Sequence, residues 1–441
     1  MKRKWNILLC AALAALLLCG CAPQTVEDMY ALPKRSEEYN QLQSAIDIAM
    51  VGLTYSAPLS GENRQSVQMA DLDGDGVDEY LVFAQGTSEK PLHVLIFCQE
   101  ADGSCLLAEV ITSTGSAFEQ VEYVQIDDLP GYELVIGRQV SDQVLRSVSV
   151  YSFAGGDANQ LMKVGYSRYF TCDLDLDGQK ELMVLQPEEM DTDRGKAMLF
   201  RYTEGVMERS VEAILSEEPS QVKRITQSSL HPGYPAIYIT SSVDESTIIT
   251  DVLAMKDGRL TNISVSNETD TSVQTLRNYY VYADDIDGDG ILELPSLVTM
   301  KAVSPWEDNE EKFLIRWYAM DLDGEEVDKA FTFHNFVGGW YLQLHYDWAR
   351  RVSVEQDGGT YTFYVWDDFY QSATALFSVY VLTGSDRNAV ATEDGRFVLF
   401  QTEDAVFAAR TEANAALFGI SKDQLIDSFS LIQEDVQAGE S

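Results

Sequence analysis

The chain has 441 residues, and its 31 lysines and arginines against 71 aspartates and glutamates give a formal net charge of −40. So acidic a protein has no basic surface to neutralise nucleic-acid phosphates or the headgroups of an anionic membrane. A hydrophobic content of 45% excludes a chain too polar to form a core, and the mutual repulsion of its charges makes bound cations an expected compensation.

The first 21 residues have the pattern of an export signal. Basic residues at positions 2–4 precede an apolar run at 7–18, which is too short for a comfortable membrane span. The following Cys-Gly-Cys resembles the end of a bacterial lipobox, with Cys21 as the lipidated residue. The alternative is an ordinary cleaved signal peptide. The lipobox predicts a protein held by lipid alone at the outer, extracellular face of the bacterial cytoplasmic membrane.

Residues 22–58 are interpreted as a tether followed by a helix. Ser36 is a suitable N-cap for a helix that runs to about Met50. Leu42, Ile46 and Met50 recur every four residues, so they form one apolar face.

Residues 59–335 contain a repeat. An acidic, glycine-containing turn followed by an apolar strand occurs in three full copies and two degenerate ones, and the shared glycines are Gly76, Gly131, Gly178, Gly233 and Gly290. A second turn, such as Glu204-Gly205 or Asp257-Gly258, follows each of these glycines after a further strand. Each unit is therefore predicted to have four short strands. A fixed period near 50 residues predicts a mainly β fold, a β-propeller of about five detectable four-stranded units with the total blade count left open.

The three full copies of the turn predict metal sites. Carboxylates at positions 1, 3, 5 and 9 and the carbonyl oxygen of position 7 surround one point, which suits Ca²⁺. These positions are Asp71, Asp73, Asp75, Val77 and Glu79 in the first loop, Asp173, Asp175, Asp177, Gln179 and Glu181 in the second, and Asp285, Asp287, Asp289, Ile291 and Glu293 in the third. The sequence thus predicts up to three Ca²⁺ sites, with the second weakened because Leu176 replaces a glycine.

Other interpretations of the acidic turns are weaker. An EF-hand needs a bidentate glutamate at position 12, where this chain has Val82, Val184 and Ser296. Turns without an ion remain an alternative, because aspartate and glycine favour turns in any case. The degenerate copies are predicted to hold no ion. The acidic stretch 321–325 falls where each unit has its second turn, so it is predicted to be that turn.

The Asp-x-Asp-x-Asp-Gly-x-x-Glu turn and the strand after it resemble the integrin-type FG-GAP or VCBS repeats of secreted and surface proteins. The resemblance covers about residues 60–335. It implies a propeller that commonly has seven blades, so chain outside this range would supply any further ones.

Residues 336–441 lack the acidic turns and are interpreted as a C-terminal α+β module. Strands are predicted at 338–344, 352–354, 360–366, 375–382 and 396–402, followed by a helix capped by Ser421. The aromatic residues of this module, among them Trp340, Tyr341 and Trp348, suit either a core or a carbohydrate or peptide site.

Three cysteines follow the signal region. Cys98 and Cys105 flank a predicted hairpin tip, where a cross-strand disulfide is one alternative and buried thiols the other. The third, Cys172, lies in a repeat unit.

No sequence motif for a nucleophile elbow, zinc helix or phosphate loop is present, and the four histidines are scattered. We therefore favour a non-enzymatic surface lipoprotein whose calcium-stabilised propeller binds a protein or glycan partner. The alternatives are a carbohydrate-active enzyme, such as a lyase or glycosidase, and a structural subunit of an envelope assembly.

Overall fold

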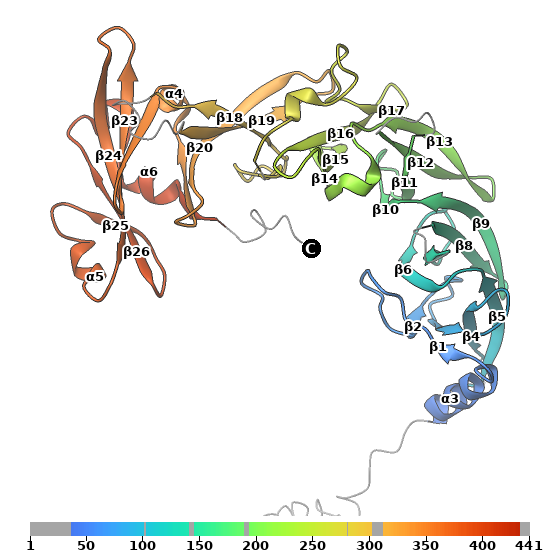
Figure 1. The fold of residues 1–441 in the computed structure, drawn as a ribbon. Helices are drawn as coiled ribbons and strands as arrows, with labels where there is room; N and C mark the ends of the chain where they lie inside the picture. Colours follow the sequence, from blue (N-terminus) through green and yellow to red (C-terminus); the bar gives the residue numbers. More distant parts are fainter. Residues whose placement is uncertain are drawn as a thin grey trace, which may run out of the picture. The chain divides into compact units, whose positions relative to one another are not determined.

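The computed structural model describes residues 37–100, 103–140, 145–188, 194–279, 281–301 and 312–432 (Figure 1). Cys21 and Ser36, with the predicted lipobox and helix cap, lie outside the described residues. The described chain is mainly β, and its strands form six antiparallel sheets. It divides into two compact units: residues 65–71 and 76–114 join the chain up to Ala57 in the first, and residues 58–64 and 72–75 join the chain from Gly115 onward in the second.

The first unit combines a helix with a five-stranded sheet. The helix is α3 (Glu37–Ala49), and the strands are β1 (Thr54–Tyr55), β2 (Val67–Ala70), β3 (Glu79–Gln85), β4 (Leu92–Gln99) and β5 (Cys105–Ser113). Ile46 is buried against Val82, Leu95 and Phe97, with Leu42 and Met50 packed beside it. The predicted apolar face of the helix is therefore confirmed. No helix among the described residues is long and apolar enough to cross a membrane.

The register of the β4–β5 hairpin does not suit the proposed disulfide. Cys105 lies opposite Gln99, and Cys98 lies opposite Leu106. Because successive side chains of a strand point to opposite faces, Cys98 and Cys105 point away from each other. The idea that they face each other across the two strands is therefore wrong.

The second unit begins with three sheets of four consecutive strands, which correspond to the second to fourth predicted repeats. Their strands are β6 (Ala117–Val124), β7 (Glu133–Gln139), β8 (Arg146–Ala154) and β9 (Asp157–Tyr166); β10 (Arg168–Cys172), β11 (Glu181–Pro187), β12 (Gly195–Thr203) and β13 (Val206–Ile214); and β14 (Val222–His231), β15 (Tyr234–Ser242), β16 (Ile248–Lys256) and β17 (Arg259–Asn262). Two short 3-10 helices, η1 (Pro219–Gln221) and η2 (Val273–Thr275), lie in the connections.

Three of the second turns, at 155–156, 204–205 and 257–258, are two-residue hairpin turns, whereas the turn between the paired Met320 and Glu326 has five residues. Thr203 pairs with Val206, and the intervening Glu204 and Gly205 have φ angles of 49° and 94°. Positive φ at both positions is the type I′ geometry that matches the twist of paired strands. The same geometry occurs at Asp257 and Gly258, with φ angles of 51° and 74°. The hairpins expected from these residue pairs are confirmed.

A shared irregularity supports the repeat independently of the turns. The pairing of neighbouring strands shifts by one residue between β4 and β5 at 96/97, between β8 and β9 at 150/151, between β12 and β13 at 199/200, and between the strands 313–320 and 326–335 at 317/318. A bulge at the same place in four sheets indicates one repeated structural unit, because bulges are features of a fold and not accidents of one strand.

The fifth repeat sheet crosses the predicted boundary at residue 336. It contains β18 (Leu294–Thr299), β19 (Phe313–Met320), β20 (Glu326–Asn335), β21 (Trp340–Leu344) and β27 (Phe429–Leu431), in that order. The sixth sheet has the order β22 (Val352–Asp357), β23 (Thr360–Asp367), β24 (Ser372–Thr383), β26 (Ala405–Thr411) and β25 (Phe397–Gln401). Short helices α4 (Tyr346–Ala349), α5 (Arg387–Val390), η3 (Ala415–Phe418) and α6 (Lys422–Asp427) complete this region.

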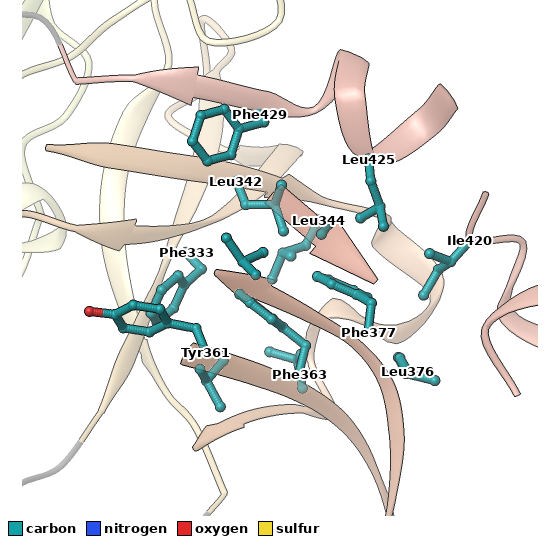
Figure 2. Packing of buried hydrophobic residues seen from close by; sticks show 14 of the residues in the cluster. Phe333, Leu342, Leu344, Tyr361, Phe363, Leu376, Phe377, Ile420, Leu425 and Phe429 are labelled. Atoms are coloured by element: carbon teal, nitrogen blue, oxygen red, sulfur yellow. The ribbon is translucent and has the colours of Figure 1, made fainter. Parts of the chain in front are cut away.

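One hydrophobic cluster joins the fifth and sixth sheets (Figure 2). Phe333 of β20 contacts Phe363 of β23 edge to face, with ring centroids 5.2 Å apart. Trp340 and Trp348 are buried in the same cluster. Some of the aromatic residues of the C-terminal region thus form a core, whereas others, such as Phe369 and Tyr370, are exposed. The helix α6 has the predicted cap, because the Ser421 hydroxyl accepts a hydrogen bond from the Gln424 amide.

Candidate functional site

The third acidic loop, residues 285–293, connects the fourth and fifth repeat sheets. The two carboxylate oxygens of Asp285 accept hydrogen bonds from the amides of Gly288 (2.8 Å) and Gly290 (2.9 Å). Asp287 accepts the amide of Asp289 at 3.1 Å. The loop is thereby wrapped so that one carboxylate oxygen of each of these three aspartates lies within 4.8 Å of the others.

Glu293, at position 9, lies on the protein side of this loop and is not part of the group of three aspartate oxygens. Its side chain is 0% exposed, and its Oε2 accepts the Ile286 amide at 3.0 Å. Its Oε1 has no hydrogen-bond partner among the described residues. Burial, together with the charges of Asp287 and Asp289, raises the pKa of Glu293 to about 7 against the lowering effects of the Ile286 hydrogen bond and of Lys329. A buried carboxylate oxygen without a partner is costly, and a cation bound at the loop would supply that partner.

The remaining predicted ligand of this loop is Ile291. Its amide donates to Asp289 at 2.9 Å, and its side chain is buried. The predicted role of its carbonyl oxygen stays a prediction.

A lysine reaches the outer side of the same loop. Lys329 is the extra residue of the β20 bulge, and its Nζ lies 2.6 Å from Asp289 Oδ2 and 3.9 Å from Asp287 Oδ2. This ion pair holds the pKa of Asp289 below its ordinary value. Lys329 therefore competes with a metal ion for oxygens of the loop.

The second loop, residues 173–181, contains a positive group of its own. Arg201 on β12 stands opposite Glu181, donates from Nε to Glu181 Oε1 at 3.0 Å, and places its terminal nitrogen 3.0 Å from Asp175 Oδ2. Glu181 Oε2 accepts the Leu174 amide at 2.9 Å. Both oxygens of the buried glutamate are thus bonded, in contrast to those of Glu293. The guanidinium offsets charge that a metal ion would otherwise offset.

The second loop brings three of its predicted side-chain ligands together, without Asp177. Oxygens of Asp173, Asp175 and Glu181 lie within 4.8 Å of one another. Asp177 accepts the amide of Gln179 at 2.8 Å. Leu176, which replaces the loop glycine, has a φ of 59°. A leucine is strained in this left-handed conformation.

The degenerate copy at residues 125–133 shows what replaces the acidic ligands. Glu133 Oε2 accepts the Ile126 amide at 2.7 Å, the same seven-residue spacing as in the other loops. Gln125 therefore occupies position 1, and its amide nitrogen donates to the carbonyl oxygens of Asp127 (2.8 Å) and Leu129 (2.6 Å). Position 7, not 6, is then Gly131, so its sequence alignment with Gly76 is wrong by one residue.

The first loop comprises residues 71–79. Asp71 and residues 76–79 belong to the first unit, and residues 72–75 belong to the second. In the first unit the Gly76 amide donates to Asp71 Oδ2 at 3.0 Å, and Glu79 is buried at the start of β3. In the second unit the Asp75 amide donates to Asp73 Oδ1 at 3.1 Å. The side chain of Val77 is exposed. Calcium binding by this loop stays a prediction.

The acidic stretch 321–325 is the hairpin turn that was predicted for it. Asp321 Oδ1 accepts the amides of Asp323 and Glu325, both at 2.9 Å, and Lys256 pairs with Asp323 at 2.8 Å. The turn joins β19 to β20.

A cavity of about 340 Å³ adjoins the third loop, in the second unit. Asp285 is part of its wall, and the other lining residues include Arg224 of β14, Tyr282, His334 of β20, Tyr341 of β21 and Ser430 of β27. We refer to it as the His334 pocket.

The aromatic groups of the His334 pocket are arranged by strand register. Across β20, β21 and β27, His334 pairs with Tyr341, and Tyr341 pairs with Ser430. The His334 and Tyr341 rings are stacked, 4.9 Å apart with 9° between their planes. Neither ring nitrogen of His334 has a hydrogen-bond partner among the described residues, and burial lowers its pKa to about 4. The Arg224 guanidinium lies 5.3 Å from the centre of the Tyr282 ring.

Sequence reasoning did not find this pocket. The histidines are scattered in the sequence, and the aromatic residues, Tyr341 among them, suited either a core or a carbohydrate or peptide site. Nothing in the sequence indicates that β27 pairs with β21, or that Arg224 lies near a strand more than 100 residues later.

Comparisons with known proteins assign no family to the chain. No model of a protein family and no curated protein matches it. Similar solved structures include the exotype rhamnogalacturonan lyase YesX, with 11% identity over 74% of this chain and 65% of that one and a TM-score of 0.27. Rhamnogalacturonan lyase YesW has 12% identity over 69% and 73% of the chains and a TM-score of 0.31. A Lactobacillus plantarum protein has 11% identity over 73% and 86% and a TM-score of 0.26.

Proposed function

We propose that this protein is a calcium-stabilised binding scaffold of propeller-type, FG-GAP or VCBS-like repeats, with Ca²⁺ held by the loop at 285–293. The observation that carries this proposal is the fully buried Glu293, whose Oε1 has no partner beside three clustered aspartates. Hard oxygen donors in a tight, glycine-containing loop are what Ca²⁺ prefers. The cation would hold Glu293, immediately before β18, against the loop that precedes it.

The loops differ in the support that they give to this proposal. Arg201 gives the second loop an internal positive charge, so we propose that it binds Ca²⁺ more weakly than the third. The third loop has only Lys329, which contacts aspartate oxygens and leaves Glu293 Oε1 available. We therefore place the strongest site in the third loop, ahead of the second, with the first as predicted from sequence.

Calcium dependence is tested on the whole protein. After chelation, Ca²⁺ and Mg²⁺ are titrated separately while thermal unfolding is followed. We expect Ca²⁺ to raise the melting temperature, because a ligand that binds only the folded state stabilises it by mass action. Mg²⁺ should have a smaller effect, since it demands a smaller and more regular shell. An unchanged melting temperature in millimolar Ca²⁺ would refute the calcium site.

The location and partner are part of the same proposal. The pattern at residues 1–21 supports lipid attachment at Cys21, with the binding surface outside the cell. Labelling cells with a fatty-acid analogue tests this directly, with Cys21→Ser as the matched variant. Crosslinking and pull-down with and without chelator would identify the protein or glycan partner.

An enzyme acting on carbohydrate is the second candidate function. The observation that favours it is the combination of Arg224, Tyr282 and Asp284 in the wall of one pocket. Incubation with a panel of polysaccharides, followed by assays for new reducing ends and for unsaturated products, separates catalysis from binding. Turnover that is lost in Asp284→Asn would favour the enzyme over the scaffold.

A further inference from the structure

We infer that the His334 pocket binds a neutral sugar ring of a glycan. This rests on the proposed function as a binding scaffold, for which it names the ligand class. Three properties of the pocket support this ligand class: its shape, its hydrogen-bonding groups and its charge.

The pocket is built from separate parts of the second unit. One wall is the sheet face that carries the row His334, Tyr341 and Ser430, and the opposite face of that sheet packs in the core that contains Phe333 and Trp340. The stacked rings of His334 and Tyr341 therefore project from a sheet whose other face is packed in the core, which fixes their positions. A volume of about 340 Å³ is at the lower end for ligand pockets and suits one or two sugar rings.

The hydrogen-bonding groups suit hydroxyls. His334 is neutral at physiological pH because burial lowers the pKa of its imidazole. A neutral imidazole offers one donor and one acceptor, and its two nitrogens are buried without a partner among the described residues. A hydroxyl can both donate and accept, so a sugar hydroxyl matches either nitrogen once the side chain turns it toward the pocket. Arg224 adds donors, Asp284 adds an acceptor, and the aromatic side chains give the apolar face of a sugar ring a surface to pack on.

The charges of the pocket disfavour other ligand classes. Asp284 and Asp285 line the same wall, so an anionic ligand would meet two carboxylates within a protein of net charge −40. A cation would be attracted by these carboxylates but repelled by the Arg224 guanidinium in the same wall. A purely apolar ligand would cover the polar groups of Arg224 and Asp284 without giving them a partner. A neutral, polyhydroxylated ring meets no like charge and can pair with both groups.

The pocket and the third loop share a residue. The carboxylate of Asp285 is held by two amides of the loop, and the residue also lines the pocket. The conformation of the loop 285–293 therefore fixes the position of the pocket wall that contains Asp285. We expect sugar binding to weaken when Ca²⁺ is removed.

The test is calorimetric titration of the calcium-loaded full-length protein with neutral trisaccharides of glucose, mannose, galactose and xylose, and with trigalacturonate as the anionic comparison. We expect saturable binding of at least one neutral trisaccharide, and at least tenfold weaker binding by Arg224→Leu and Tyr341→Ala. Arg224 is exposed, so its replacement spares the core, and thermal unfolding checks that Tyr341→Ala folds. The matched control is Tyr370→Ala, an exposed aromatic outside the pocket that should leave binding unchanged.

Three results would overturn the inference: no saturable binding of any neutral trisaccharide at millimolar concentration, tighter binding of trigalacturonate, or wild-type affinity in both pocket variants. The Ca²⁺-induced rise in melting temperature is measured on the same samples. If that rise persists without sugar binding, only the sugar inference fails. If sugar binds but Ca²⁺ has no effect, the proposed calcium site fails and the sugar site stands.

Discussion

Replacing Glu293 with glutamine should have opposite effects with and without calcium. The substitution keeps the shape of the side chain and an oxygen that can accept the Ile286 amide, but removes the negative charge. In metal-free protein this charge is buried beside the aspartates of the loop, so its removal should stabilise the fold. In calcium-loaded protein the same charge is a ligand, so its removal should destabilise.

The size of the metal-free effect follows from the pKa of Glu293. The pKa is raised from 4.5 to about 7, and at about 1.4 kcal/mol per pKa unit the ionised form costs at most about 3.5 kcal/mol. The exposed aspartates are screened by solvent, so we expect roughly half of this, about 1.7 kcal/mol. A raised pKa means that the contribution of Glu293 to stability is present below about pH 4.5 and is lost as the pH rises through 7. The stabilisation by Glu293→Gln should therefore appear at pH 8 and vanish at pH 4.5.

The stabilisation that Ca²⁺ gives should be larger in the wild type than in Glu293→Gln. At a free Ca²⁺ concentration 100 times the dissociation constant, binding stabilises the folded state by about 2.7 kcal/mol. At about 1.5 °C per kcal/mol for a unit of this size, the melting temperature should rise by about 4 °C. Glu293→Gln should lose most of this rise.

Calorimetry measures the stability of the wild type and of Glu293→Gln in chelator and in Ca²⁺, each at pH 4.5 and at pH 8. The control is Glu325→Gln, an exposed carboxylate in the hairpin turn at 321–325, which should change stability little in either condition. If Glu293→Gln is destabilising in chelator at pH 8 and retains the full calcium response, Glu293 is neither an uncompensated charge nor a ligand, and the reasoning fails.

Four further predictions follow from the same geometry. Lys329→Met should tighten Ca²⁺ binding at 285–293 about threefold by removing a competing exposed ion pair, and unchanged or weaker calorimetric affinity would contradict this. Arg201→Met should lower metal-free stability by about 1–3 kcal/mol, because a buried glutamate loses its partner, and Ca²⁺ should restore part of the loss. Leu176→Gly should stabilise by about 0.5–1 kcal/mol in urea unfolding, since it relieves a left-handed leucine at the cost of some chain entropy. The depressed pKa of His334 contributes stability above pH 6.5 that is lost toward pH 4, so His334→Phe should flatten the stability profile between these values.

Local chemistry explains which parts of the fold were predictable. The hairpins at Glu204-Gly205 and Asp257-Gly258 depend on residues that tolerate positive φ, and the loops depend on aspartate spacing. In both cases the residues that determine the turn or loop lie within a few positions of it in the sequence. The apolar face of α3 is equally local, because its period is that of one helix.

Contacts between distant segments were not predictable in this way. Arg201 and Lys329 reach acidic loops that lie 20 to 44 residues before them, and their positions depend on strand register and on a bulge. Arginine and lysine on a strand are ordinary surface residues unless that register is known. The same holds for Cys98 and Cys105, whose relative orientation is decided by the register of one hairpin.

The pairing of β27 with β21 has a consequence for how the protein folds. Trp340 lies opposite Leu431, so the last strand of the fifth sheet is added only after about 90 further residues have been made. Closing so long a loop is entropically costly and slow compared with hairpin formation. In a chain that emerges from its amino end, the earlier repeat sheets have all their strands before this one does. The edge of β21 is exposed to other strands during that interval, and the wall of the His334 pocket that contains Ser430 is the last part to form.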